Sequence, residues 1–167
     1  MDLNQSQNQE LIIRNAKPED CQLIWEWAND PVTRAVSFSS EPILWEGHVP
    51  WFSAKLADSN CMFFMVLDAH DLPIGQIRLE VDESEATISV ALAPSQRGKG
   101  YGARIIQLAS QKVFDRMQIE IIHAYIKPDN TASIRAFAKA GFSKAGIITV
   151  HGNQALDFVL LRAARKL

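Results

Sequence analysis

The most specific part of the sequence is one glycine-rich segment, Ser95-Gln96-Arg97-Gly98-Lys99-Gly100-Tyr101-Gly102, which lies between an apolar strand and an amphipathic helix. Glycines at alternate positions allow a sharp turn that brings consecutive main-chain N–H groups close to an anion. The next helix adds the positive end of its dipole. Arg97 and Lys99 add charge at the rim, although each contributes little in an exposed loop. The segment therefore predicts a seat for a pyrophosphate.

The spacing of these glycines excludes two common nucleotide-binding classes. A Walker loop needs Gly-Lys-Ser/Thr, and a dinucleotide fingerprint needs Gly-x-Gly-x-x-Gly, so neither matches residues 95–102. A tight strand-to-helix turn also uses glycine for steric reasons alone, so the segment by itself leaves a structural role open.

The elements on either side of this segment predict an α/β fold. Alternation and helical periodicity indicate strands at 11–15, 61–67, 73–81, 86–93, 119–126, 142–150 and 155–161, and helices at 17–28, 45–56, 100–117 and 131–140. Asn29-Asp30-Pro31 is expected to end the first helix, and Pro50 to bend the second or confine its regular part to the residues after the proline. Hairpins succeeded by alternating strands and helices indicate a central mixed, mostly antiparallel sheet with helices on both faces.

Composition limits the possible partners. The 167 residues are 47% hydrophobic and 22% charged, with a net charge of −2 and no block of like charge, so we expect no nucleic-acid partner. Residues 1–10 are expected to form a flexible tail and 11–167 a single domain, without a signal sequence or membrane anchor. Cys21 and Cys61 lack metal-site spacing and are expected to be buried thiols in a reducing cytoplasm.

Two segments together resemble one enzyme family. Residues 96–102 resemble the Gln/Arg-x-x-Gly-x-Gly/Ala signature by which the GNAT superfamily of N-acetyltransferases binds acetyl-CoA. The later segment Lys127-Pro128-Asp129-Asn130-Thr131-Ala132-Ser133-Ile134-Arg135-Ala136-Phe137-Ala138-Lys139-Ala140-Gly141-Phe142 is similar to the family's Asn-x-x-Ser/Ala-x-x-x-Tyr-x-Lys-x-Gly-Phe helix. Both occur in the family's order, and the resemblance covers the chain from about Leu11 onward.

The resemblance implies acetyl-CoA as cofactor, bound between two parallel strands that splay apart. The main-chain N–H of Leu92 is then expected to stabilise the oxyanion formed when an amine attacks the thioester. The family pattern assigns cofactor contacts to Val90, Leu92, Gln96, Arg97, Gly98, Lys99, Gly100, Tyr101, Gly102, Asn130, Ser133 and Phe137. Asn130 also suits a helix N-cap, and both roles are compatible.

Phe137 departs from the family pattern, because many members carry there a tyrosine thought to protonate the thiolate. Phenylalanine donates no proton, so water, Tyr125 or Tyr101 has to supply it.

The reaction also needs a base, since an ammonium cannot attack a thioester. Alternation places Gln76, Arg78 and Glu80 on one face of their strand, so Glu80 is a candidate base, with Ser89 holding a water or the substrate. A solvated strand-end carboxylate is the alternative for Glu80. His48 is a rival base, although a lone histidine is commonly structural, as we expect for His123 and His151.

The first half of the chain contains the segments Trp27-Ala28-Asn29-Asp30-Pro31 with Arg34, Ser37-Phe38, Glu46-x-His48-x-x-Trp51-Phe52 and Pro73-Ile74-Gly75-Gln76-Ile77-Arg78. Together they resemble the GNAT subgroup that acetylates amino sugars carried on nucleotides, as in pseudaminic-acid pathways. Ala28 departs from this pattern, where an arginine is common. Aromatic surfaces, polar groups and cations that suit such a small-molecule acceptor are Trp27, Arg34, Phe38, Trp51, Gln76 and Arg78. Tryptophans at helical spacing are also typical of a core.

Three other functions stay open. The chain is also compatible with a protein N-terminal or ribosomal-protein acetyltransferase, which needs an open groove, and with an aminoglycoside acetyltransferase, for which Asp82, Glu83 and Glu85 offer acidic groups. The absent tyrosine keeps a non-catalytic acyl-CoA-binding module in consideration. Monomer and homodimer are both compatible with the sequence, and no membrane partner is expected.

Overall fold

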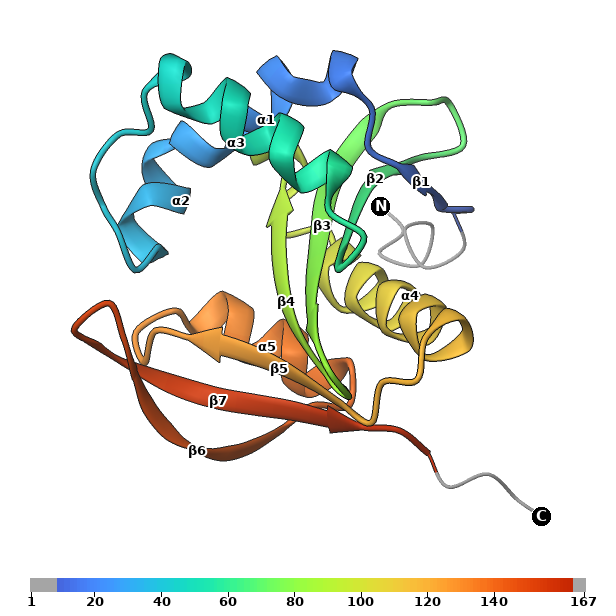
Figure 1. The fold of residues 1–167 in the computed structure, drawn as a ribbon, viewed down its shortest axis with the longest axis vertical. Helices are drawn as coiled ribbons and strands as arrows, with labels where there is room; N and C mark the ends of the chain where they lie inside the picture. Colours follow the sequence, from blue (N-terminus) through green and yellow to red (C-terminus); the bar gives the residue numbers. More distant parts are fainter. Residues whose placement is uncertain (1–8, 164–167) are drawn as a thin grey trace, which may run out of the picture.

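The computed structural model describes residues 9–163, which fold around one seven-stranded sheet of order β1-β2-β3-β4-β5-β7-β6 (Figure 1). The strands are β1 Ile12–Asn15, β2 Cys61–Leu67, β3 Pro73–Asp82, β4 Glu85–Leu92, β5 Ile121–Ile126, β6 Ser143–Val150 and β7 Asn153–Leu161. The helices are α1 Cys21–Asn29, α2 Pro31–Val36, α3 Trp45–Ala57, α4 Tyr101–Arg116 and α5 Thr131–Lys139, with short 3-10 turns at Pro18–Asp20 and Pro94–Gln96. Every strand pair is antiparallel except β4 with β5, so the predicted mixed, mostly antiparallel sheet is confirmed.

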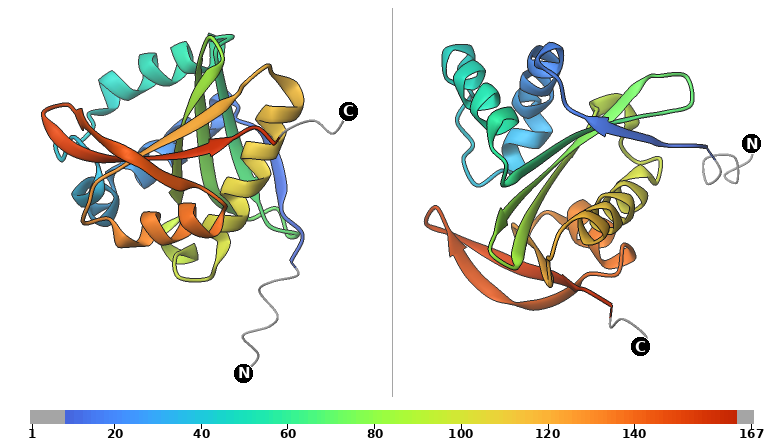
Figure 2. Two further views of the ribbon diagram at one scale, coloured as in Figure 1. Left: turned by 90° about the horizontal axis from the view of Figure 1, so that it is seen from below. Right: turned by 45° about the vertical axis from the view of Figure 1, so that its right-hand side comes forward.

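Helices cover both faces of the sheet, as predicted. α1, α2 and α3 lie on one face, and α4 and α5 lie on the other (Figures 1 and 2). The larger core forms under α4 and α5, where Ile77, Leu79, Ile105 and Ile122 are fully buried. A smaller core under α1 and α3 contains Trp27, Ile24, Phe52, Phe63, Met65 and Ala93.

The first helix, α1, ends at Asn29 as predicted, and the helical region departs from the predictions at α2 and α3. A short helix that was not predicted, α2, begins directly after α1, because Asp30 caps it with its side chain and Pro31 occupies its first helical position. α3 is regular from Trp45 onward, so Pro50 does not confine it to the residues after the proline. Pro50 lacks the N–H that would bond to Glu46, but the buried side chains of His48 and Phe52 on either side anchor the helix.

The β4–β5 pairing is short. Only Glu85, Ala86 and Thr87 pair with Ile121, Ile122 and His123, after which the two parallel strands separate. The predicted splay is therefore confirmed, and it divides the sheet into a β1–β4 part and a β5–β7 part (Figure 2).

The first described residues belong to the segment that was expected to be a flexible tail. Of the expected tail 1–10, residues 1–8 lie outside the described part of the chain. Gln9 already contacts α4, because its side-chain oxygen accepts a hydrogen bond from the Tyr101 hydroxyl at 2.8 Å and its carbonyl accepts one from Arg104 at 2.6 Å. None of the helices within residues 9–163 is both long and apolar enough to cross a lipid bilayer.

Candidate functional site

The glycine bend before α4 presents open main-chain donors. Gly98 and Gly100 have φ angles of 72° and 83°, in the left-handed region, and Gly100 is the N-cap of α4. Within the described residues, the N–H groups of Gly98, Lys99 and Gly100 form no hydrogen bond to another main-chain group. A Cβ added at either glycine would meet no protein atom within 4 Å. The bend therefore has open space and unpaired donors at the positive end of a helix.

The charged side chains of the bend are less free than expected. The Arg97 guanidinium lies 2.8 Å from Asp30 and donates to the Thr33 hydroxyl at 2.8 Å, so it joins the bend to the beginning of α2. Burial acts to raise the pKa of Asp30, but the bonds from Arg97 and from α2 N–H groups outweigh it and lower the pKa. Lys99 lies 3.3 Å from the side-chain oxygen of buried Gln96, which supports the bend from within.

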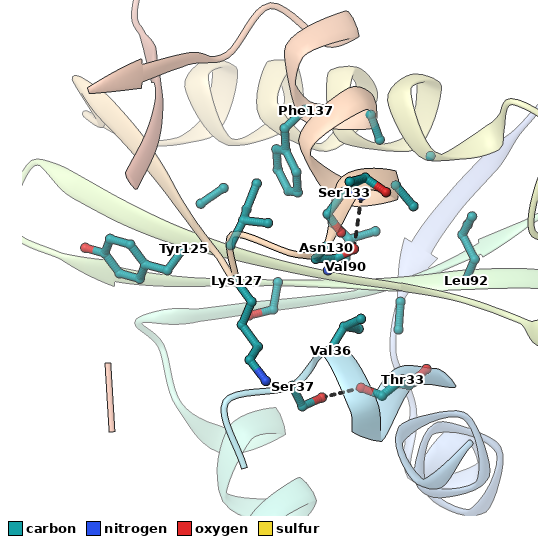
Figure 3. Close-up of a pocket in the computed structure, with 18 of the residues that line it drawn as sticks. Thr33, Val36, Ser37, Val90, Leu92, Tyr125, Lys127, Asn130, Ser133 and Phe137 are labelled. Atoms are coloured by element: carbon teal, nitrogen blue, oxygen red, sulfur yellow. Dashed lines mark hydrogen bonds between the residues drawn. The ribbon is translucent and has the colours of Figure 1, made fainter. Parts of the chain in front are cut away.

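A cavity of about 530 Å³ occupies the gap between β4 and β5. Figure 3 shows α5 on one side of it, with Ser133 and Phe137, and α2 on the other, with Thr33 and Val36. The predicted site residues that line it are Phe38, Ser89, Val90, Leu92, Arg97, Gly102, Asn130, Ser133 and Phe137. The structure thus brings the two sequence motifs to one cavity.

The main chain of β4 is oriented toward this gap at alternate residues. The N–H of Ala93 donates to the Ile74 carbonyl on the β3 side at 2.9 Å. Because successive N–H groups of a strand point to opposite sides, those of Val90 and Leu92 point to the side that β5 has left. Two amides therefore face the cavity without a strand to receive them.

The α5 side of the cavity combines a helix cap with an apolar wall. The Asn130 side chain accepts a bond from the Ser133 N–H at 3.3 Å, which confirms the N-cap role. Phe137 is buried with its ring edge-to-face against Phe142, 5.0 Å between centroids. At Gly102 a Cβ would lie 3.3 Å from the Ala136 Cβ, so the glycine lets α4 and α5 approach closely.

The two tyrosines considered as proton donors occupy different places. Tyr101 is buried, and its hydroxyl bonds to Gln9 outside the cavity. Tyr125 lines the cavity, and its side chain extends along the sheet away from Leu92 (Figure 3). Burial and the nearby Asp157 carboxylate raise the pKa of Tyr125.

The structure does not bring His48 to the cavity. Its side chain is 2% exposed, its Nε2 lies 2.9 Å from the Cys21 carbonyl, and its ring stacks on Phe52. Burial lowers the pKa of His48, although the bond to Cys21 acts to raise it. His48 therefore does not have the position that a catalytic base requires. Its imidazole instead joins α3 to α1 inside the smaller core.

Two predicted acceptor contacts are also structural. Trp27 is buried in the core under α1. The Arg34 guanidinium donates to the Ala28 carbonyl at 2.6 Å and to the Ser39 carbonyl at 2.9 Å, which fixes the chain after α2. Neither side chain lies on the cavity wall.

The predicted polar face of β3 is present. Gln76, Arg78 and Glu80 pair in register with Ala91, Ser89 and Thr87 of β4, so this polar face adjoins the Ser89 edge of the cavity. Glu80 forms an ion pair with Lys55 of α3. The Arg78 guanidinium lies 5.0 Å from the Trp51 ring centroid, also on α3.

Residues of α2 were missed as part of the site. Val32, Thr33 and Val36 of α2 line the cavity opposite α5, as does Ser37, the residue that caps the end of α2. The dipeptide Asp30-Pro31 carried the signal, since an aspartate N-cap with proline at the first helical position is a helix beginning.

His123 has the structural role expected of it, since its Nδ1 lies 2.9 Å from an Asp157 carboxylate oxygen on β7. No group of three metal-ligating side chains suited to hold a metal ion occurs within residues 9–163.

Residues 10–143 match the family described as acetyltransferase (GNAT) domain. The chain belongs to the GNAT acetyltransferases. The expected acetyl-CoA-dependent N-acetyltransferase is therefore confirmed at the level of this family, whereas the match does not extend to the nucleotide-sugar subgroup.

Curated relatives of this GNAT chain differ in the amine they are named for. A kanamycin resistance protein of Rhizobium radiobacter is 31% identical over 86 residues, which are 51% of this chain and 80% of the relative. An L-2,4-diaminobutyric acid acetyltransferase of Nocardia farcinica is 27% identical over 142 residues, 83% of this chain and 67% of the relative.

Solved structures share the fold at low identity. An aminoglycoside acetyltransferase in complex with coenzyme A has a TM-score of 0.80 at 20% identity, covering 92% of this chain and 95% of that one. A spermidine N-acetyltransferase from Vibrio cholerae with CoA and spermine has a TM-score of 0.81 at 20% identity, covering 90% and 95%.

Proposed function

We propose that this GNAT chain transfers the acetyl group of acetyl-CoA directly to a primary amine of a small molecule, in the gap between β4 and β5. The single observation that carries the proposal is that the cavity with the open amides of Val90 and Leu92 is also lined by Arg97 and Gly102, which flank the open donors of Gly98 and Gly100. The free thiols of Cys21 and Cys61 fit a reducing compartment such as the cytoplasm.

The residues at the cavity fit this donor in shape and chemistry. The open space beside Gly98 and Gly100 accommodates a diphosphate, which the N–H groups of the bend and the α4 dipole stabilise. The amides of Val90 and Leu92 suit the amide groups of a pantetheine arm, and Phe137 supplies an apolar wall. When bound, acetyl-CoA supplies an activated thioester carbonyl.

The chain's own residues then have three tasks. The Leu92 N–H donates to the developing oxyanion in the gap. Glu80, with Ser89, receives the proton of the amine through water, because Ser89 lines the cavity and Glu80 lies next along the same face. Tyr125 is the tyrosine that remains as proton donor to the thiolate, and it acts through water, because it lines the cavity but its side chain extends away from Leu92.

The acceptor that we propose is an amino sugar carried on a nucleotide. The resemblance of the first half of the chain supports this choice, as do the aromatic surfaces of Phe38 at the cavity and of Trp51, which is 36% exposed. Aminoglycosides, diaminobutyrate and polyamines, for which relatives and structural neighbours are named, are the alternative acceptors. The candidate acceptors differ most clearly in charge, because aminoglycosides and polyamines are purely cationic, whereas diaminobutyrate and a nucleotide-linked sugar also carry negative groups.

Titration of acetyl-CoA, combined with a thiol-release assay over a panel of amines, tests the proposal. We expect binding and amine-dependent release of CoA, with kcat reduced about 10²-fold in Glu80→Gln while acetyl-CoA affinity is retained. Binding without release for any amine would favour a non-catalytic acyl-CoA module. Unchanged kcat in Glu80→Gln would remove Glu80 as the base and leave the acetyl transfer standing.

A further inference from the structure

The Arg78 guanidinium packs against a neighbouring ring, but its hydrogen-bond donors lack partners in the described part of the chain. Its Nε is buried and lacks a hydrogen-bond partner, with the nearest carboxylate oxygen, that of Glu80, at 3.5 Å. Its plane lies near the Trp51 ring, 5.0 Å from the centroid. Within the described residues, no hydrogen bond from the terminal guanidinium nitrogens to the protein is found, although the side chain is only 22% exposed.

Arg78 shares its neighbouring ion-pair partner, Glu80, with a second cation. Glu80 is already paired with Lys55 of α3, so the three side chains together carry one excess positive charge. Two other arginines, Arg34 and Arg97, already use their donors within the protein. Arg34 donates to the carbonyls of Ala28 and Ser39. Arg97 donates to the Thr33 hydroxyl and forms an ion pair with Asp30. Arg78 therefore differs from both, because its fork of donors is available for a ligand.

The location of Arg78 links it to the reaction site. Arg78 is the register partner of Ser89, which lines the cavity. Its neighbour on the same face, Gln76, has a buried side-chain oxygen without a partner. Arg78 and Gln76 lie beside Ser89 and Ala91 of the cavity wall and not on the wall itself. A small molecule whose amine enters the gap therefore meets the guanidinium and the unsatisfied amide where it extends across β4 toward β3.

We propose that Arg78 binds an anionic group of the acceptor, a carboxylate or a phosphate, so that the enzyme selects amines that also carry a negative charge. This inference rests on the proposed acetyl transfer and narrows its substrate class. Stacking on Trp51 limits the rotation of the guanidinium, which favours bidentate recognition of a planar carboxylate or a phosphate. A purely cationic amine meets like charge at the same place.

Matched acceptor pairs provide the test. 2,4-Diaminobutyrate is compared with 1,3-diaminopropane, which lacks only the carboxylate, and glucosamine 6-phosphate with glucosamine. Binding to the CoA complex, which cannot turn over, is measured by calorimetry, and kcat/KM is measured with acetyl-CoA. We expect the anionic member of at least one pair to be preferred about ten- to a hundredfold, and the pair concerned identifies carboxylate or phosphate.

Three variants separate recognition from a structural role. Arg78→Met retains the stem over Trp51 and is expected to bring the preference to about one, whereas Arg78→Lys retains part of it because the charge stays and the fork is lost. Lys144→Met, at an exposed position of β6, is the control and leaves the preference as in the wild type. Circular dichroism confirms that each variant is folded.

The outcomes for the inference and for the proposed function are distinct. Acetylation of both members of each pair without preference overturns the Arg78 inference and leaves the acetyl transfer intact. Selective binding of an anionic member without turnover overturns the acetyl transfer and supports the anion subsite. An equal loss of binding for both members of a pair in Arg78→Met overturns the inference, because it indicates a structural role.

Discussion

The bend before α4 depends on two residues whose backbone lies in the left-handed region. Gly98 and Gly100 reach φ angles of 72° and 83°, which cost other residues about 1 kcal/mol or more. We expect Gly100→Asp to weaken acetyl-CoA binding strongly, because it adds backbone strain and a negative charge where the diphosphate is proposed to bind.

Gly100→Ala is the matched control, since it adds the strain without the charge. Calorimetric titration is expected to show a further loss of at least about tenfold from Ala to Asp, as one uncompensated charge contact contributes about 1.5–3 kcal/mol. Equal affinity in Gly100→Asp and wild type would count against the diphosphate seat.

His48 illustrates a titratable residue with a structural task. His48→Gln is expected to lower the free energy of unfolding by about 1–3 kcal/mol, because the bond to the Cys21 carbonyl and the ring packing are disturbed. The KM for acetyl-CoA is expected to remain unchanged, since His48 does not line the cavity. A loss of turnover without a loss of stability would contradict this placement.

The contribution of His48 to stability depends on pH in a definite direction. Burial keeps the pKa of the folded-state imidazole below 6.5. As the pH falls below about 6.5, the unfolded chain binds a proton that folded His48 does not, so the free energy of unfolding declines until the folded-state pKa is reached. Denaturant titrations from about pH 7.5 to about pH 5.5 should therefore show the advantage of wild type over His48→Gln shrinking.

Site residues were predictable from the sequence where they belong to a motif with fixed spacing. Arg97, Gly102, Asn130 and Phe137 belong to such motifs, and the structure brings them to one cavity. His48, Trp27 and Arg34 belong to the looser resemblance of the first half of the chain, and each is held by core packing or by carbonyls. Tertiary partners of this kind come from distant elements, so the local sequence does not display them.

Among the elements, α2 connects the glycine bend before α4 with the wall of the cavity. The Asp30 side chain accepts bonds from the N–H groups of Val32 and Thr33 and also pairs with Arg97 of the bend. We expect Asp30→Ala to weaken acetyl-CoA binding, because α2 loses its cap and one wall of the cavity loosens. Asp30→Asn keeps the cap and frees Arg97, so it is expected to bind acetyl-CoA more tightly than the wild type.

Calorimetry on both variants, with hydrogen exchange across α2, checks this prediction. Faster exchange is expected in Asp30→Ala alone. Identical behaviour of the two variants would show that the ion pair, and not the cap, holds the wall.

Most helices and strands were predictable because the spacing of apolar residues in their sequence matches the spacing of buried residues in the structure. In β3, alternate residues such as Ile77 and Leu79 are buried while Arg78 and Glu80 are not. α2 has six residues, too few to show a helical period, and only its capping residues indicated it.

At the scale of the whole molecule, a ligand in the β4–β5 gap connects two parts of the sheet that share only a short ladder. Acetyl-CoA at about 100 times its Kd is expected to stabilise the fold by about 2.7 kcal/mol, which raises Tm by about 5–10 °C. Differential scanning fluorimetry measures the shift, and Gly100→Asp serves as the control with little or none. A wild-type Tm that is independent of acetyl-CoA would contradict the proposed binding mode.

The early parting of β4 and β5 gives the donor a second role beside carrying its acetyl group. A pantetheine arm has amides spaced much as in an extended peptide, so it can act as a temporary strand that supplies the absent rungs beside Val90 and Leu92. Binding of acetyl-CoA would then complete the hydrogen bonding between the two parts of the sheet, and each release of CoA would remove these bonds again.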